Sequence, residues 1–120
     1  MSAPLVVLVT FPSWEAARSI STVLVREGLA ACVNLLPGAE SVYRWEGKVE
    51  VAPEVVGLVK TTTARVEELE QRYLSLHPYE VPEFLTLGAV NGSRAYLDWL
   101  STSVAEFKER EKPRDTISQL

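Results

Sequence analysis

Runs of hydrophobic residues along the chain predict the strands of a β-sheet. Residues 5–11 (LVVLVTF) form a continuous, largely β-branched run, which is typical of a strand that is buried on both faces or paired on both edges. Residues 29–36 form a second apolar run, and residues 54–62 form a third that is typical of a central strand. Residues 84–87 (FLTL) predict the last strand.

Alternating hydrophobic and polar residues between the second and third runs predict a hairpin. Residues 40–45 and 48–51 alternate on either side of a turn, which indicates two strands with one solvated face. The Pro-Gly pair at 37–38 is expected to end the second run. Pro53 is expected to interrupt the chain between the hairpin and the third run, at a bend or an edge position.

Hydrophobic residues recur at helical spacing in three further segments. We expect Ser13 to cap the first helix and Gly28 to end it. Thr63 is expected to cap the second helix, and Pro78 ends it because the residue before a proline avoids helical dihedral angles. Ser93 is expected to cap the third helix, whose inner stripe consists of Tyr96, Leu97, Leu100 and Val104.

The order of these elements is strand, helix, strand, strand, helix, strand, helix. Two strand-helix-strand crossovers joined by a hairpin predict an α+β fold, namely a ferredoxin-like split βαβ sandwich (βαββαβ plus a C-terminal helix) with helices on one face of an antiparallel sheet. We expect a single domain over residues 1–107, followed by a charged C-terminal tail at residues 108–120.

Composition and charge narrow the classes of partner. The 120 residues carry 12 basic and 16 acidic side chains, a net charge of -4, and the basic residues are dispersed, which argues against nucleic acid. Cys32 is the single cysteine, so no internal disulfide can form, and the N-terminus lacks a basic region of the secretory type. No apolar run reaches the roughly 20 residues that span a bilayer. We therefore expect a cytoplasmic protein that binds neither nucleic acid nor membranes.

Most signatures of an enzyme are missing from the sequence. One histidine and one cysteine cannot form a zinc cluster within one chain, and no glycine-rich phosphate loop is present. Cys32 lies within an apolar run, which favours a packed side chain, with a soft-metal ligand as the alternative. The sequence therefore predicts a protein that is not an enzyme.

The segment Leu76–Glu83 (LHPYEVPE) holds the densest group of polar side chains. An imidazole, a phenol and two carboxylates lie between or beside two prolines that stiffen the loop. His77 has two interpretations that remain open: a metal-binding or proton-transfer residue, or a residue that only caps the C-terminal end of the second helix.

Three other positions attract attention as interface or pocket residues. Tyr43 and Trp45 stand at the hairpin tip, where large rings would be exposed in a monomer, which indicates an obligate oligomer. Lys60 ends an apolar strand, and it either solubilises that end or places a cation at the mouth of a pocket.

Several short motifs follow one another in order along the chain. They are Leu29-Ala-Ala-Cys-Val-Asn34, Pro37-Gly38, Ser41-Val-Tyr43, Trp45-Glu-Gly-Lys48, Lys60-Thr61, His77-Pro-Tyr-Glu80, Pro82-Glu83 and Tyr96-Leu-Asp-Trp99. With these motifs the chain resembles, from about Val6 to Leu100, the CutA family, the divalent-cation tolerance proteins. The resemblance implies a ferredoxin-like subunit in a homotrimer whose sheets join edge to edge around a three-fold axis, an architecture shared with the PII-type signalling proteins.

The same resemblance implies binding of copper or another divalent cation. In the bacterial pattern, copper is attributed to a cysteine on the first strand and to two histidines before Pro-Tyr; this chain has Val9 and Leu76-His77 at those places. One imidazole per subunit binds copper weakly unless neighbours add ligands, so a high-affinity site is weak or absent. The metal ligands that we expect at an inter-subunit site are His77, Glu80 and Glu83.

Two alternatives stand beside this leading hypothesis of a homotrimeric divalent-cation-binding tolerance protein. One is a purely structural trimeric assembly without metal. The other is a PII-like sensor whose inter-subunit pocket takes a small anionic ligand, a carboxylate or a phosphate, because a lysine and an imidazole lie beside aromatic walls. That pocket would be lined by Lys60, His77, Tyr79 and Glu80, with Tyr43 and Trp45 from the hairpin of another subunit.

Overall fold

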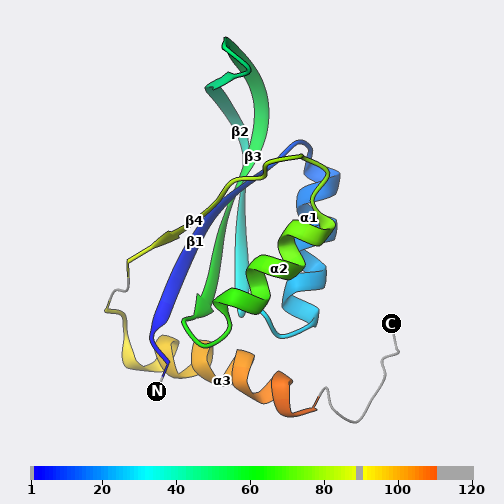
Figure 1. Cartoon of the computed structure of the whole chain (residues 1–120). Coiled ribbons are helices and arrows are strands. Elements are labelled where there is room, and N and C mark those ends of the chain that lie inside the picture. The colour runs from blue at the N-terminus through cyan, green and yellow to red at the C-terminus, as the bar shows by residue number, and fades with distance from the viewer. Residues whose placement is uncertain (1, 89–90, 111–120) are drawn as a thin grey trace.

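The chain folds into one four-stranded sheet with three helices (Figure 1). The computed structural model describes residues 2–88 and 91–110, and of residues 105–110 only the backbone. All strand pairs are antiparallel in the order β2-β3-β1-β4, so the predicted α+β, ferredoxin-like topology is confirmed. The elements are β1 (Pro4–Phe11), α1 (Trp14–Arg26), β2 (Cys32–Trp45), β3 (Lys48–Thr62), α2 (Val66–Leu76), β4 (Phe84–Leu87) and α3 (Arg94–Arg110).

Two hydrophobic clusters hold the layers together. Helices α1 and α2 cover one face of the sheet, and the main core lies between them and the strands (Figure 1). α3 lies apart from these helices and packs Leu100 and Val104 against Ala31 and the partly buried Cys32. The third helix therefore does not share the face of the other two. The main core includes Val7, Val9, Phe11, Ile20, Leu24, Val59, Leu69 and Tyr73.

Strands β2 and β3 are longer than predicted, because neither expected break interrupts them. Their pairing runs from Cys32 opposite Lys60 to the hairpin turn, and a bulge between Leu36 and Ala39 absorbs the Pro-Gly pair, with Gly38 at φ +85°. Pro53 lies inside β3, in a stretch where β1 no longer pairs. Since β3 has a free edge there, a proline is tolerated without ending the strand.

The predicted helix caps are confirmed at two of three positions. The hydroxyl of Ser13 accepts a hydrogen bond from the Ala16 amide at 3.1 Å, and that of Ser93 accepts one from Tyr96 at 3.3 Å. The prediction for Thr63 is wrong. Arg65 is the N-cap of α2 and makes no side-chain cap, while the Thr63 hydroxyl accepts from the Ala3 amide at 3.1 Å and so ties the start of β1 to this turn.

Two expectations for the C-terminal part are also changed. Tyr96 is 41% exposed, so the predicted buried stripe of α3 is open at this residue, although Tyr96 lies one turn before Leu100 and its hydroxyl is close to Cys32 on β2. Its ring lies 5.4 Å from that of Trp99. α3 continues to Arg110, so it includes the first three residues of the predicted tail, and residues 111–120 lie outside the described part. Among the described helices, none is long and apolar enough to cross a membrane.

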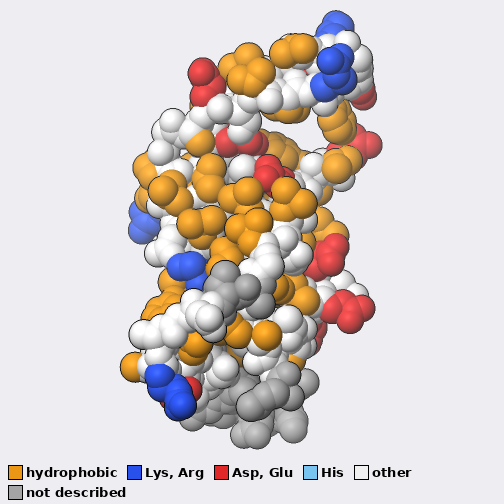
Figure 2. Space-filling view, turned by 90° about the vertical axis from the view of Figure 1, so that its left-hand side faces the viewer, with side chains coloured by type: hydrophobic (Ala, Val, Ile, Leu, Met, Phe, Trp, Pro, Cys, Tyr) orange, Lys and Arg blue, Asp and Glu red, His pale blue; other side chains and the backbone are white. Residues whose placement is uncertain are grey.

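The second face of the sheet is left partly uncovered. Register and strand alternation place a row of apolar side chains on this face, which we call the open face: Val6, Leu8, Leu36, Val56, Leu58, Leu85 and Leu87. Leu36, Leu85 and Leu87 are 44–55% exposed. Figure 2, seen from the side on which β4 lies, shows hydrophobic side chains gathered over the middle of the molecule. Such a patch indicates an interaction surface.

Candidate functional site

The end of the β2–β3 hairpin extends beyond the helices and stands over residues 77–83, the segment that joins α2 to β4 (Figure 1). Between them lies a pocket of about 560 Å³, which we call the hairpin pocket. Figure 2 shows the molecule hollowed beneath the hairpin end, with acidic side chains beside the hollow. The pocket is lined by Thr10, Ser41, Val42, Tyr43, Trp45, Glu54, Tyr79, Glu80, Val81 and Glu83.

The bulge in β2 decides which hairpin side chains share the face of Glu54. One extra residue between Leu36 and Ala39 shifts the alternation of β2, so that odd-numbered residues beyond the bulge lie on the face that even-numbered residues occupy before it. Ser41, Tyr43 and Trp45 therefore share a face with Glu54, whose own partner across the sheet is Ala39. This shared face forms one wall of the pocket.

Glu54 is the best-anchored charge in the pocket, and it is not among the site residues expected from the sequence. Its Oε1 accepts a hydrogen bond from the Ser41 hydroxyl at 2.6 Å, and its Oε2 accepts one from the Tyr79 hydroxyl at 2.7 Å. Burial, and then the hydrogen bond to Glu54, raise the pKa of Tyr79 well above the ordinary value of a phenol, so Tyr79 stays a neutral donor near pH 7. The signal in the sequence is slight: one carboxylate after Pro53 at the start of an apolar run.

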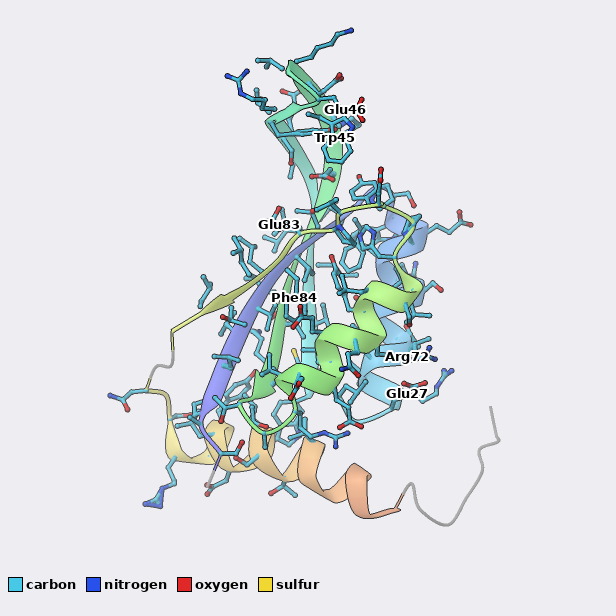
Figure 3. All side chains as sticks on the ribbon, viewed as in Figure 1. Glu27, Trp45, Glu46, Arg72, Glu83 and Phe84 are labelled. Atoms are coloured by element: carbon cyan, nitrogen blue, oxygen red, sulfur yellow. The ribbon has the colours of Figure 1, made fainter. Side chains whose placement is uncertain are left out.

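The pocket is acidic. Glu54, Glu80 and Glu83 line it, and none of its lining residues is Lys, Arg or His. Trp45 lies near the end of the hairpin and Glu83 at its base (Figure 3). Each of the two segments contributes both kinds of residue, since Glu54 lies on the hairpin with Trp45, and Tyr79 lies on the 77–83 segment with Glu83. Fixed negative charges in a partly enclosed pocket favour a cation.

The donor set fits a hard cation better than a soft one. Carboxylate and hydroxyl oxygens suit Mg²⁺, Ca²⁺ or Mn²⁺, whereas copper prefers imidazole or sulfur. Among the side chains that the structure describes, no group of three or more His, Cys, Asp or Glu converges closely enough to hold a metal ion directly. The carboxylates could therefore hold a cation that keeps most of its water.

His77 lies beside this pocket and does not line it. Its ring is 8% exposed, Nδ1 accepts a hydrogen bond from the Tyr79 amide at 3.1 Å, and Nε2 is 2.8 Å from the Thr10 carbonyl. Because an amide donates to Nδ1, the ring hydrogen belongs on Nε2, where it is donated to Thr10. The ring also stacks on Phe11, with centroids 5.7 Å apart. Both ring nitrogens are thus used within the subunit.

Lys60 is separated from the other residues that the sequence singled out. It is six residues from Glu54 along β3, a span of roughly 20 Å in an extended strand. Its Nζ contacts the Asn34 side-chain oxygen and lies 4.0 Å from the Cys32 sulfur. The structure brings Tyr43, Trp45, Tyr79, Glu80 and Glu83 together within one chain, and it leaves the pocket without the basic residue that an anionic ligand would need.

Comparisons with known proteins agree with this architecture. The family model of the CutA1 divalent ion tolerance protein matches residues 5–103. The Divalent-cation tolerance protein CutA of Thermus thermophilus is 54% identical over 95 residues, which cover 79% of this chain and 92% of that protein. The protein of the same name from Escherichia coli is 42% identical, over 86% of this chain and 92% of its own length.

Solved structures give the same result. A divalent cation tolerance protein of Thermus thermophilus superposes with a TM-score of 0.81 at 51% identity, covering 83% of this chain and 97% of the other. CutA of Xylella fastidiosa superposes with a TM-score of 0.83 at 42% identity, covering 86% and 99%. The matched family consists of tolerance proteins without enzymatic activity, which confirms the expectation of a non-enzyme. This chain belongs to the CutA1 divalent ion tolerance protein family.

Proposed function

We propose that the protein serves divalent-cation tolerance by binding cations in the hairpin pocket. The observation that supports this is the charge of the pocket lining: three carboxylates and no basic residue around about 560 Å³. Such a lining attracts a divalent cation and raises its local concentration.

The cation in this proposal is hard and hydrated. Both carboxylate oxygens of Glu54 already accept a hydrogen bond from a hydroxyl group. Glu54 therefore attracts a cation by its negative charge rather than by coordinating it directly. Of the metal ligands expected from the sequence, Glu80 and Glu83 remain in the proposal, and Glu54 joins them. His77 supports Tyr79 through its Nδ1 and does not itself meet the ion. Binding of copper with high affinity is not part of the proposal.

Calorimetric titration with Mn²⁺, Mg²⁺ and Cu²⁺ tests this proposal. We expect Glu54→Gln to weaken Mn²⁺ binding about tenfold, the loss of roughly 1.4 kcal/mol of attraction. Glu70→Gln on the exposed face of α2 removes the same charge away from the pocket and is expected to leave binding unchanged. Equal Mn²⁺ affinity in the wild type and Glu54→Gln contradicts the proposal.

The assembly in which this pocket works is, in our proposal, a homotrimer. The open face carries apolar side chains that the helices of the described part leave exposed, and the hairpin exposes Val49 and Val51, which do not line the pocket, at 57–64%. A second and a third copy of the chain would bury both surfaces, which a stable monomer rarely leaves in water. Sedimentation equilibrium is expected to give three times the 13.3 kDa of one chain; a monomer at micromolar concentration contradicts it.

For the compartment, we propose the cytoplasm. Cys32 is a free thiol in the described structure, as suits a reducing environment. Relatives differ in this respect: the Arabidopsis thaliana protein, of which this chain spans 54%, is named chloroplastic, and the Archaeoglobus fulgidus structure is titled periplasmic. Fractionation of cells that express the tagged chain tests the assignment, and recovery outside the cytoplasm contradicts it.

A further inference from the structure

One wall of the hairpin pocket is aromatic, and a hydrated metal ion would gain little from contact with it. The rings of Tyr43, Trp45 and Tyr79 line the same volume as the three carboxylates, with Val42 and Val81 beside them. Trp45 is 39% exposed and Tyr43 44% exposed, so both rings keep surface that a ligand can cover. Aromatic faces attract cations, and they do so best when the cation is weakly hydrated.

The hydrogen bonds of Glu54 lead in the same direction. Each carboxylate oxygen already accepts a short hydrogen bond, from Ser41 or from Tyr79. A metal ion that bound Glu54 directly would have to displace or share these donors. A cation without directional bonding needs only the negative charge and close contact, and it leaves both hydrogen bonds in place.

The size of the pocket is also informative. A volume of about 560 Å³ lies within the range of pockets for small organic ligands and is much larger than the space that one metal ion fills. Hydrophobic contact with Trp45, Val42 and Val81 would contribute only if the ligand itself carried apolar groups.

We propose that the hairpin pocket binds a small quaternary ammonium ion, held by the aromatic faces of Trp45 and Tyr43 and by the charge of Glu54. This inference rests on the proposed cation-binding function, and it names a second ligand class for the same pocket. The two ligand classes share the carboxylates, and only the ammonium ion uses the aromatic wall. Divalent and organic cations therefore compete for the pocket.

Titration of the assembled protein with choline and with 3,3-dimethyl-1-butanol tests the proposal. The two molecules have the same shape and differ in charge, so we expect the neutral alcohol to bind at least about tenfold more weakly. Mn²⁺ at saturating concentration is expected to lower the apparent affinity for choline. Equal affinity for the two organic molecules overturns the proposal.

Variants separate the two ligand classes. Trp45→Leu is expected to weaken choline binding about tenfold and to leave Mn²⁺ binding unchanged, and Trp45→Phe is expected to retain most of the choline affinity. Trp99→Leu removes an indole of similar exposure from α3 and serves as the control. Circular dichroism and sedimentation confirm that each variant is folded and assembled.

The possible failures can be told apart. If Mn²⁺ binding depends on Glu54 but choline does not bind, or binds Trp45→Leu as well as the wild type, this inference fails and the proposed function stands. If neither cation responds to Glu54→Gln, both fail.

Discussion

The two sides of the segment 77–83 carry similar side chains in different roles: the inner side is part of the packed core, and the outer side lines a pocket. On the inner side, His77, Tyr73 and Phe11 form an aromatic cluster, and the Thr10 carbonyl lies 2.8 Å from His77 Nε2 and 3.3 Å from the Tyr73 hydroxyl. On the outer side, Tyr79 and Glu54 face an open pocket whose charges have no basic counterpart in its lining. Rings and polar groups occur on both sides, but only the inner side is buried with its polar atoms paired.

This difference shows how a residue type that suggests chemistry can be structural. A buried polar group must be paired, and once it is paired its lone pairs are no longer free for a ligand. His77 meets that requirement fully, whereas Glu54, Glu80 and Glu83 carry net charge that hydroxyl donors do not neutralise. Residues on the open side can respond to a ligand, and residues on the closed side hold the segment in place.

The largest loss of stability should follow from His77→Ala. The change removes two hydrogen bonds and the ring that packs on Phe11 and Tyr73, so we expect a loss of about 3 kcal/mol in the free energy of unfolding. Urea denaturation at matched protein concentration measures it, because assembly contributes to apparent stability. If His77→Ala keeps its stability but no longer binds Mn²⁺, His77 is a metal ligand, and the distinction between a structural inner side and a ligand-binding outer side is wrong.

Removal of the hydroxyl of Tyr73 or of Tyr79 should lower the free energy of unfolding by less than His77→Ala does, and by different amounts for the two residues. Tyr73→Phe leaves the partly buried Glu83 carbonyl without its donor at 2.8 Å and removes the hydroxyl of a fully buried ring, so a loss of about 1–2 kcal/mol is expected, with cation binding unchanged. Tyr79→Phe should cost about 0.5 kcal/mol, because water can reach Glu54, but it should change cation affinity. Denaturation combined with Mn²⁺ titration separates the two. The same profile for both variants would show that the two sides are not distinct.

The smallest effect should appear at alkaline pH. Burial is the leading reason why the pKa values of Tyr73 and Tyr79 are raised above the ordinary value of 10.0. The unfolded chain ionises these phenols near pH 10, whereas the folded chain does not. Their contribution to stability is therefore complete below that pH and is lost as the pH rises further.

Spectrophotometric titration of phenolate absorbance measures this effect. We expect three tyrosines to titrate above the ordinary pKa of a phenol, Tyr73 and Tyr79 later than Tyr96. Glu54→Gln should lower the pKa of Tyr79 more than that of Tyr73, because only Tyr79 donates to that carboxylate. Early titration of both tyrosines in the folded protein would contradict the assignment.

Much of the fold could be predicted because local patterns and the sheet agree. The apolar runs at β1, β3 and β4, the caps at Ser13 and Ser93, and the stop before Pro78 depend on neighbours in sequence. The bulge could not be predicted, since Pro37-Gly38 also suits the end of a strand. β2 continues beyond the bulge because its residues pair with those of β3, the other strand of the hairpin.

The site was predictable only in part, for a related reason. Short motifs with conspicuous residues single out Tyr43, Trp45, Tyr79, Glu80 and Glu83. The expected pocket takes the two hairpin rings from another subunit, whereas the structure brings them beside Tyr79 within one chain. Glu54 escaped notice because its importance comes from Ser41 and Tyr79, which lie 13 and 25 residues away. The pairing of His77 with the Thr10 carbonyl spans 67 residues, and no local pattern reveals such a contact.

The bulge between Leu36 and Ala39 is a local addition that the pairing on either side of it does not require. Deleting Gly38 would leave one residue opposite Val55 and keep Ala39 opposite Glu54, so Tyr43 and Trp45 would stay on the face of Glu54. What the extra residue contributes is the bend and the added twist of a bulged strand, and hence the direction in which the hairpin leaves the sheet. A chain shorter by this one glycine would therefore keep its aromatic wall and hold it at a different angle over residues 77–83.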